Sequence, residues 1–460
     1  MRNDWWSCNG KGNAESESGG AESVSSTPPL LHSSTHLTRR GLLVGGALAA
    51  VGWATTRRTA LADLTLNPGR REPEGDVLVT IFLRGGADGL NMVVPHQESE
   101  YHKHRPVLGI AAPKDGKVAG NQRAVDLDGF FGLHPSLNPF LPLFKEGKLG
   151  IVHAVGSGDQ TRSHFEAMSA MERGLFTDAT GTSSGWIARH LTATAGKNNS
   201  PLRAIALSSI MPDALRGYLN ASAVNSITDF RLDLPVAQKE QSANKAVVDA
   251  LKDLYGGGKD LMAHAGNETL AVLDSLNRLN PEQYQASNGA VYPEGELGRG
   301  LKQVACLVKG GVGLEVACLD KGGWDTHYVQ GGSAGLQAGL LDELSRSVSA
   351  FAQDLGKSMD RVTLVVMTEF GRRLHENNSL GTDHGRASVM FLLGGGVNGG
   401  KVHGEWPGLA ERQLEPPGDL RVTTDYRDVL AEVLAKRVGN KELGSVFPGY
   451  SPHFRGILRA

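Results

Sequence analysis

The sequence predicts an α/β protein built on one doubly wound, mostly parallel sheet with helices on both faces. Mostly apolar runs recur at 76–83, 149–155 and 362–367, and the last has no polar face, which is typical of a strand buried on both sides. Helical spacing of apolar residues precedes the last run: Leu340, Leu344, Val348, Phe351 and Leu355. This alternation of strands and helices favours a single domain.

Composition and segment character bound the organisation of the chain. Its 460 residues are 40% hydrophobic and 21% charged, with a net charge of −2, which gives no reason to propose a nucleic-acid partner. We expect one domain over residues 63–460. Residues 96–131 are polar and irregular and are expected to form a surface excursion, and residues 229–303 a helical insertion with solvated charges.

The first 62 residues read as a leader. Residues 1–36 are polar and are predicted to be disordered. Arg39 and Arg40 then precede a small-residue apolar run, and Ala60-Leu61-Ala62 fits a cleavage site, which resembles a twin-arginine export signal. The alternative is an uncleaved anchor, but the run is short for a span of about 20 residues. We expect a periplasmic or extracellular mature protein without a stable membrane span.

Cysteines give little further constraint. Cys8 lies in the leader, which leaves Cys306 and Cys318. A disulfide between them is allowed in an oxidising compartment. Their predicted places, in a helix and in a buried strand, argue against it.

Acidic and imidazole side chains follow several of the predicted strands. Ligands of open α/β sheets bind at the carboxyl ends of strands, and mixed carboxylate and imidazole donors suit zinc, manganese or iron. We therefore predict a divalent metal site, of one or two ions. The candidate ligands are Asp88, Asp325, His327, Glu369, Asp383 and His384. Each motif alone is weak, and Asp88-Gly89 is also a common turn pair.

A hydroxyl-bearing turn precedes a predicted helix. Thr161, Arg162 and Ser163 stand just before residues with helical spacing. Ser and Thr are preferred N-cap residues, so capping is the simplest interpretation. The alternative is an anion site with a nucleophilic hydroxyl, because free N–H groups converge at a helix start. Arg162 or Arg372 would then hold the anion with two hydrogen bonds.

Five blocks of the sequence together resemble one exported bacterial family. They are 82–91 (FLRGGADGLN), 161–165 (TRSHF), 323–327 (GWDTH), 369–372 (EFGR) and 382–385 (TDHG). The family is catalogued as domain of unknown function fifteen-oh-one, and it is similar to a distant branch of the alkaline phosphatase and sulfatase superfamily. The resemblance covers nearly all of the chain after the leader and implies an alkaline-phosphatase-like fold.

The resemblance also implies residue roles. Asp88 matches a metal-binding acid, and Thr161 or Ser163 the nucleophile. Asp325, His327 and His384 match ligands of one metal, and Glu369 an acid of the second. The chain departs from the superfamily in two ligand positions. One residue, not three, separates Asp325 from His327, and Glu369-Phe370 stands where Asp-His is usual, so the second metal lacks a ligand unless Asp383 supplies it. The sulfatase Cys/Ser-x-Pro-x-Arg signature is absent.

These observations predict an exported metal-dependent hydrolase of phosphate or sulfate esters with a hydroxyl nucleophile. A small molecule or a polymer would be its substrate. The alternative is a non-catalytic envelope binding or assembly protein that keeps the fold. A transferase acting on envelope polymers would use the same residues.

Overall fold

The computed structural model describes residues 76–176, 182–196, 198, 200–229, 241–256, 258 and 261–459. The chain divides into a unit of residues 1–56 and a unit of residues 57–460. The predicted leader and its cleavage site lie outside the described residues. In the described ranges, no helix is both long and apolar enough to cross a membrane.

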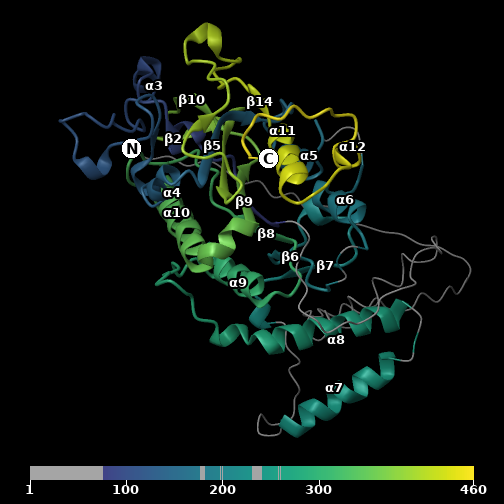
Figure 1. Cartoon of the computed structure of the whole chain (residues 1–460). Helices are drawn as coiled ribbons and strands as arrows, with labels where there is room; N and C mark the ends of the chain where they lie inside the picture. Colours follow the sequence, from purple (N-terminus) through teal and green to yellow (C-terminus); the bar gives the residue numbers. More distant parts are fainter. Residues whose placement is uncertain are drawn as a thin grey trace, which may run out of the picture. The chain divides into compact units, whose positions relative to one another are not determined.

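A nine-stranded sheet forms the centre of the second unit (Figure 1). Its strands lie in the order β13-β5-β12-β9-β1-β8-β6-β7, with β14 also paired to β5. Every pairing is parallel except the two made by β12, which runs antiparallel to β5 and β9. The predicted α/β class with a mostly parallel sheet is confirmed. The strands are β1 (Val77–Leu83), β5 (Leu149–Gly156), β6 (Ala204–Leu207), β7 (Ala221–Val224), β8 (Val316–Lys321), β9 (Val362–Thr368), β12 (Ser388–Gly394), β13 (Val402–His403) and β14 (Thr424–Asp425).

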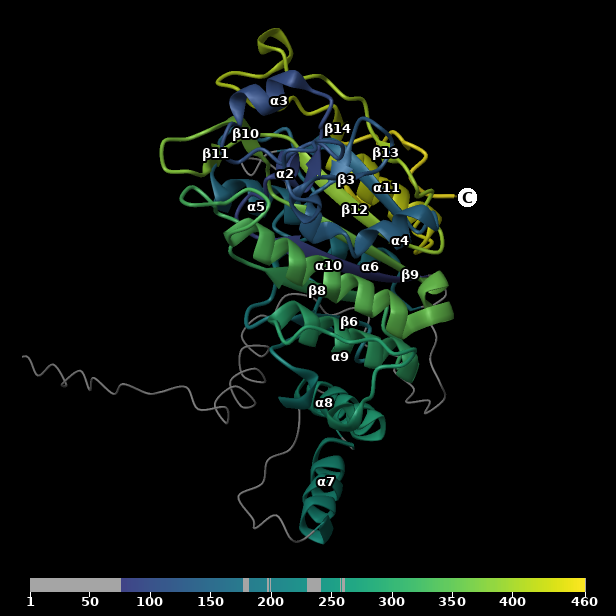
Figure 2. The ribbon, with the colours of Figure 1, turned by 90° about the vertical axis from the view of Figure 1, so that its left-hand side faces the viewer.

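Helices cover both faces of this sheet, and strands such as β1 and β9 are therefore buried on both sides. In β1, Val79 and Ile81 belong to one apolar cluster, whereas Leu78 and Phe82 belong to a second. The first cluster includes side chains of α4 (Phe140–Lys145), α9 (Glu296–Gly310) and α10 (Leu336–Leu355). The second includes side chains of α6 (Trp186–Ala193), α11 (Tyr426–Lys436) and α12 (Leu443–Val446). Figure 2 shows α9 and α10 lying along the sheet.

Two long helices occupy part of the segment expected to be a helical insertion. They are α7 (Gln241–Gly256) and α8 (Leu261–Leu279), which pack on each other, and α8 also contacts α9. The thiols of Cys306 in α9 and Cys318 in β8 are both free and buried.

Short elements complete the described chain. A hairpin is formed by β10 (Arg372–Glu376) and β11 (Thr382–His384), and a small sheet has the order β2-β4-β3. The remaining strands and helices are β2 (Val93–Val94), β3 (Val125–Asp126), β4 (Gly132–Leu133), α2 (Gly89–Met92), α3 (Ser99–His104) and α5 (His164–Glu172).

Candidate metal centre

The candidate site lies at one edge of the large sheet. Strands β1, β8 and β9 are parallel, and β5 points the same way because two antiparallel pairings through β12 relate it to β9. Their carboxyl ends therefore share an edge. The loops after β8 and β9 carry Asp325 and Glu369, His164 begins α5 after the loop that follows β5, and the β10–β11 hairpin adds His384.

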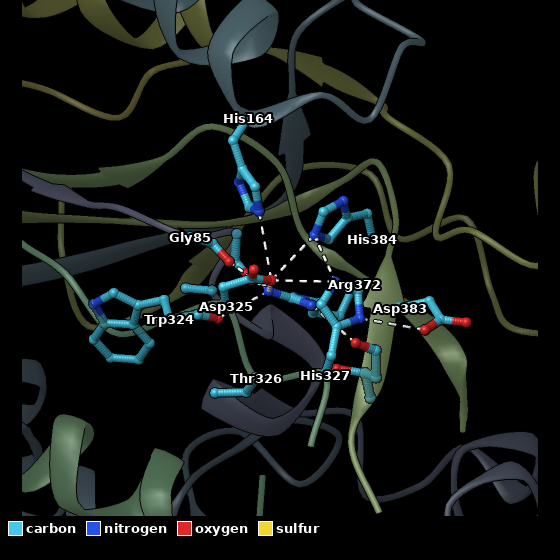
Figure 3. Close-up of polar contacts among 12 residues, drawn as sticks. Gly85, His164, Trp324, Asp325, Thr326, His327, Arg372, Asp383 and His384 are labelled. Carbon is cyan, nitrogen blue, oxygen red and sulfur yellow. Dashed lines mark hydrogen bonds and ion pairs between the residues drawn. The ribbon is translucent and has the colours of Figure 1, made fainter. Parts of the chain in front are cut away.

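Three side chains form a cluster with metal-ligand spacing. One ligand atom each from His164, Asp325 and His384 lies within 4.8 Å of the others. Asp325 Oδ1 is 3.4 Å from Nε2 of His164 and 3.1 Å from Nε2 of His384. His327 lies beside them, with its Nε2 3.2 Å from Asp325 Oδ1 and 2.9 Å from His384 Nε2. Figure 3 shows these rings pointing toward the Asp325 carboxylate.

Each imidazole is oriented by an acceptor at its other nitrogen. Nδ1 of His164 lies 2.8 Å from Glu369 Oε1. Nδ1 of His327 lies 3.3 Å from Asp383 Oδ1. Nδ1 of His384 lies 2.9 Å from the carbonyl oxygen of Arg162. All three contacts place an acceptor at Nδ1, so a tautomer with its proton on Nδ1 would leave each Nε2 lone pair free to face a metal ion, as in metal-bound histidines.

Glycines let the supporting loops approach closely. Gly85, after β1, has φ +123°, and a Cβ there would lie 2.4 Å from the Asp325 nitrogen. Its N–H donates to Glu369 Oε1 at 2.8 Å. A Cβ on Gly381 would lie 2.3 Å from the His327 carbonyl carbon. Side chains at either position would push apart the segments that carry the cluster.

Charge and burial shift the acidities of the cluster. Burial alone would raise the pKa of Asp325, but hydrogen bonds from Arg372 and His384 outweigh it and hold that pKa at about 2. The hydrogen bond to Glu369 raises the pKa of His164, whereas burial lowers the pKa of His384. The Asp325 carboxylate is therefore anionic across the physiological range.

The cluster fits a divalent metal ion. Nε2 of His164 is buried and has no hydrogen-bond partner, which leaves a lone pair directed at the cluster. The Nε2 atoms of His327 and His384 are 2.9 Å apart, a distance at which one can donate a hydrogen bond to the other or both can face one cation. Imidazole nitrogens with one carboxylate oxygen form a donor set that suits zinc, and also manganese or iron.

The other predicted ligands occupy outer positions. Glu369 and Asp383 contact the Nδ1 atoms of His164 and His327 and so lie behind the rings. Asp88 lies in a different environment, because Arg105 binds both of its carboxylate oxygens at 2.6 and 3.0 Å and Gln330 donates to one of them at 2.7 Å. Its oxygens are thus committed to a buried ion pair, and the structure does not bring it into the three-residue cluster.

The two predicted anion-binding arginines are bound to protein acceptors. The guanidinium of Arg372 is fully buried and donates to Asp325 and to four carbonyl oxygens. Arg162 pairs with Asp419 and donates to the carbonyl oxygens of Pro416 and Gln160. Both therefore anchor the loops of the site.

The two predicted hydroxyls differ in their contacts. Thr161 Oγ1 donates to Asp159 at 2.6 Å and accepts from the Ser163 N–H at 3.2 Å. Ser163 is the N-cap residue of α5, but its side chain makes no capping hydrogen bond. The Ser163 hydroxyl is thus available on the residue directly before His164.

His164 is the cluster member that sequence reasoning missed. It lies in the 161–165 block and follows the end of β5, just as Asp325 follows β8 and Glu369 follows β9. The same strand-end rule would have included it.

The chain was compared with solved structures, with curated proteins and with protein families. Two solved structures of TAB5 alkaline phosphatase, each with a histidine substituted and magnesium bound in the M3 site, are similar at 10% identity. Each match covers 70% of this chain and 91% of the chain in the solved structure, with TM-scores of 0.27 and 0.23. No curated protein matches the sequence.

A family model matches most of the chain. It is described as "Protein of unknown function (DUF1501)" and spans residues 76–439, from the residue before β1 to beyond α11. All members of the cluster lie inside the match. The chain is therefore a member of the DUF1501 family.

Proposed function

We propose that the protein is a metal-dependent hydrolase of phosphate or sulfate esters. The observation that carries the proposal is the convergence of imidazole Nε2 atoms on Asp325, with an acceptor behind every ring. His164, Asp325 and His384 would hold the ion, and His327 is the candidate fourth ligand. A bound zinc or manganese ion would supply Lewis-acid chemistry toward the ester oxygens.

The chain's own residues prepare this centre. Arg372 Nη2 lies 2.8 Å from Asp325 Oδ1 and holds that carboxylate in place. Glu369 is fully buried and orients His164 while it also accepts hydrogen bonds from Gly85 N–H and Thr368 Oγ1. Such outer contacts fix ring direction and keep imidazole basic.

Ser163 is our candidate for the nucleophile. Its hydroxyl belongs to the residue adjacent to His164, and it is not used to cap α5. A serine hydroxyl needs a base or a metal to become nucleophilic. The next residue, His164, belongs to the candidate metal centre, which would supply this activation. Thr161 is the weaker candidate because its oxygen already donates to Asp159 and accepts from the Ser163 N–H.

Metal analysis of the purified protein tests the centre. We expect about one zinc or manganese ion per chain, and loss of that ion in His384→Ala. His403→Ala is a matched control, because His403 is also partly buried but its Nε2 pairs with the Asn398 carbonyl oxygen. A wild-type protein that binds no divalent ion, or a His384→Ala protein that retains it, contradicts the proposal.

A panel of aryl phosphates, phosphodiesters and aryl sulfates tests the activity. We expect turnover by the metal-loaded wild type and loss by several orders of magnitude in Ser163→Ala. Melting temperatures should change little. If metal binds but no substrate is turned over, the hydrolase proposal fails and the binding or assembly role takes its place.

We also propose export by the twin-arginine route, which rests on Arg39, Arg40 and the Ala60–Ala62 motif. Changing both arginines to lysine should leave a full-length precursor in the cytoplasm. Normal export of that variant, or a mature protein that still begins at Met1, contradicts this proposal.

A further inference from the structure

A buried polar network centred on Gln330 joins the two segments that carry the cluster. Gln330 lies in the loop after β8, and its side chain is fully buried. The side chains around it are buried as well: Asp88, Thr326, Gln337 and Thr382. Buried polar groups of this kind hold a unique geometry when all of their hydrogen bonds are made.

The Gln330 amide uses its whole hydrogen-bonding capacity. Nε2 donates to Asp88 Oδ2 and to Gln337 Oε1, each at 2.7 Å. Oε1 accepts from the hydroxyls of Thr326 at 2.9 Å and Thr382 at 2.6 Å. An amide offers two donors and two acceptor sites, so no further partner is needed.

Asp88 decides which way this amide points. Arg105 donates a hydrogen bond to each oxygen of Asp88 in the interior. Turning the amide round would place Gln330 Oε1 against Asp88 Oδ2 with no proton between them. An unsatisfied buried acceptor costs about 1–3 kcal/mol. Gln330 Oε1 is therefore directed at the two threonine hydroxyls.

These hydroxyls belong to the ligand-bearing segments. Thr326 lies between Asp325 and His327, and Thr382 precedes Asp383 and His384. A direct backbone hydrogen bond also joins them, from Thr382 N–H to the Thr326 carbonyl oxygen at 3.2 Å. Gln330 adds a side-chain bridge at the same place, so a backbone contact and a side-chain contact together join the two segments there.

We propose that Gln330 is the positioning residue of the metal centre. It holds segment 325–327 against segment 382–384 at the spacing that binds the ion, and Asp88 with Arg105 sets the direction of its amide. The inference rests on the proposed metal centre. The family resemblance implies that Asp88 is a metal ligand. The inference instead assigns Asp88 the role of anchoring the bridge.

Zinc affinity of the full chain, measured by competition with a chromophoric chelator, tests the bridge. Gln330→Met keeps the length of the side chain and removes its hydrogen bonds. We expect it to weaken zinc binding about 10- to 100-fold, as outer contacts of metal sites do. Thr382→Val should also weaken binding, and Thr382→Ser, which restores a hydroxyl, should bind as the wild type does. In the double variant Gln330→Met/Thr382→Val the losses should not multiply, because both changes break one bridge.

Asn440→Ala is the matched control. Asn440 is an equally buried amide that bridges His190 and the Glu442 N–H away from the cluster. Asn440→Ala should lower the melting temperature and leave the zinc affinity unchanged. Wild-type affinity in both Gln330→Met and Thr382→Val overturns the bridge while the metal centre stands. A wild type that binds no zinc overturns both. If Gln330→Met does not fold, the comparison of Thr382→Val with Thr382→Ser decides.

Discussion

Three residues around the site adopt left-handed backbone angles that favour glycine. They are Arg162 at φ 56°, Val329 at φ 47° and Leu380 at φ 59°. Val329 N–H donates to the Ser379 carbonyl oxygen, and the next residue, Gln330, donates to that of Leu380. The paired loops thus compensate for a conformation that is unfavourable for a β-branched residue. They are also the loops that carry His327 and Asp383.

Val329→Gly should stabilise the protein. The side chain is 67% exposed, so its loss removes little packing, and glycine adopts φ 47° without strain. Relief of strain minus the added backbone entropy predicts a free energy of unfolding higher by about 0.5–1 kcal/mol. Urea denaturation measures this. Val291→Gly is the control, because Val291 is 74% exposed and has no positive φ. Val291→Gly should lower the free energy of unfolding. Equal changes of this free energy in both variants would contradict relief of strain at Val329.

Asp354 should make stability depend on acid pH. Burial would raise its pKa, but Lys309, Ser287 N–H and the hydroxyls of Tyr292 and Tyr284 outweigh burial and lower it. A lowered carboxyl pKa stabilises the fold above the ordinary value of about 3.9, and this stability is lost as pH falls below it. Urea denaturation from pH 5 downward should show a steeper loss for wild type than for Asp354→Asn. If the stability of wild type and of Asp354→Asn falls equally with pH, Asp354 does not contribute to the pH dependence.

At the scale of elements, strand ends were predictable and strand direction was not. The apolar runs of β1, β5 and β9 identify buried strands, and the ends of these strands help to locate the site. The run of β12 looks the same, because an apolar pattern does not encode direction. A signal was present in the 19 residues between β9 and β12, which form a hairpin and no helix. A parallel return needs a crossover, usually helical, so this connection predicts the reversal.

The candidate site was predictable in its members more than in their roles. Asp325, His327 and His384 lie side by side, and Glu369 and Asp383 lie behind the rings. The position of Asp88 depended on Arg105, which lies in the 96–131 segment expected to be a surface excursion. Arg105 is in fact fully buried. Sequence pattern does not show which carboxylate a distant guanidinium will occupy.

The end of β9 supplies a further prediction. Glu369→Gln removes the negative charge that raises the pKa of His164 and makes its Nδ1–H a strong donor. We expect zinc affinity to fall about 10- to 100-fold, measured by chelator competition. Glu432→Gln is a matched control, since Glu432 is also fully buried and accepts from Lys436 and two backbone N–H groups. An unchanged affinity in Glu369→Gln would show that Glu369 does not support the ligand.

For the whole molecule, buried histidines predict a second region of pH dependence. Burial lowers the pKa values of His134, His153 and His190 to about 4. Between pH 4 and about 6.5 the unfolded chain therefore binds more protons than the folded one. Stability should be full above about pH 6.5 and fall as pH drops toward 4, at up to about 1.4 kcal/mol per pH unit for each group.

Urea denaturation in the presence of a chelator measures this slope without a contribution from metal release. His153→Gln should flatten it, because that residue no longer titrates, although its lost contact with the Val93 carbonyl oxygen lowers stability at every pH. A slope that is unchanged in His153→Gln would show that folding does not lower the pKa of His153.

The reversal of β12 has a consequence for how relatives of this chain can differ in length. Because β12 starts at the edge that carries the cluster, residues 369–388 supply Glu369, Asp383 and His384 without a detour across the sheet. The strand ends at Gly394, on the opposite edge, where β1, β8 and β9 begin and where none of the candidate residues lies. Insertions at the loop that follows Gly394 leave the spacing of the ligands intact, whereas one added residue in 369–388 alters it. Family members should therefore differ in the length of the loop after Gly394 and share the length of the segment that corresponds to residues 369–388.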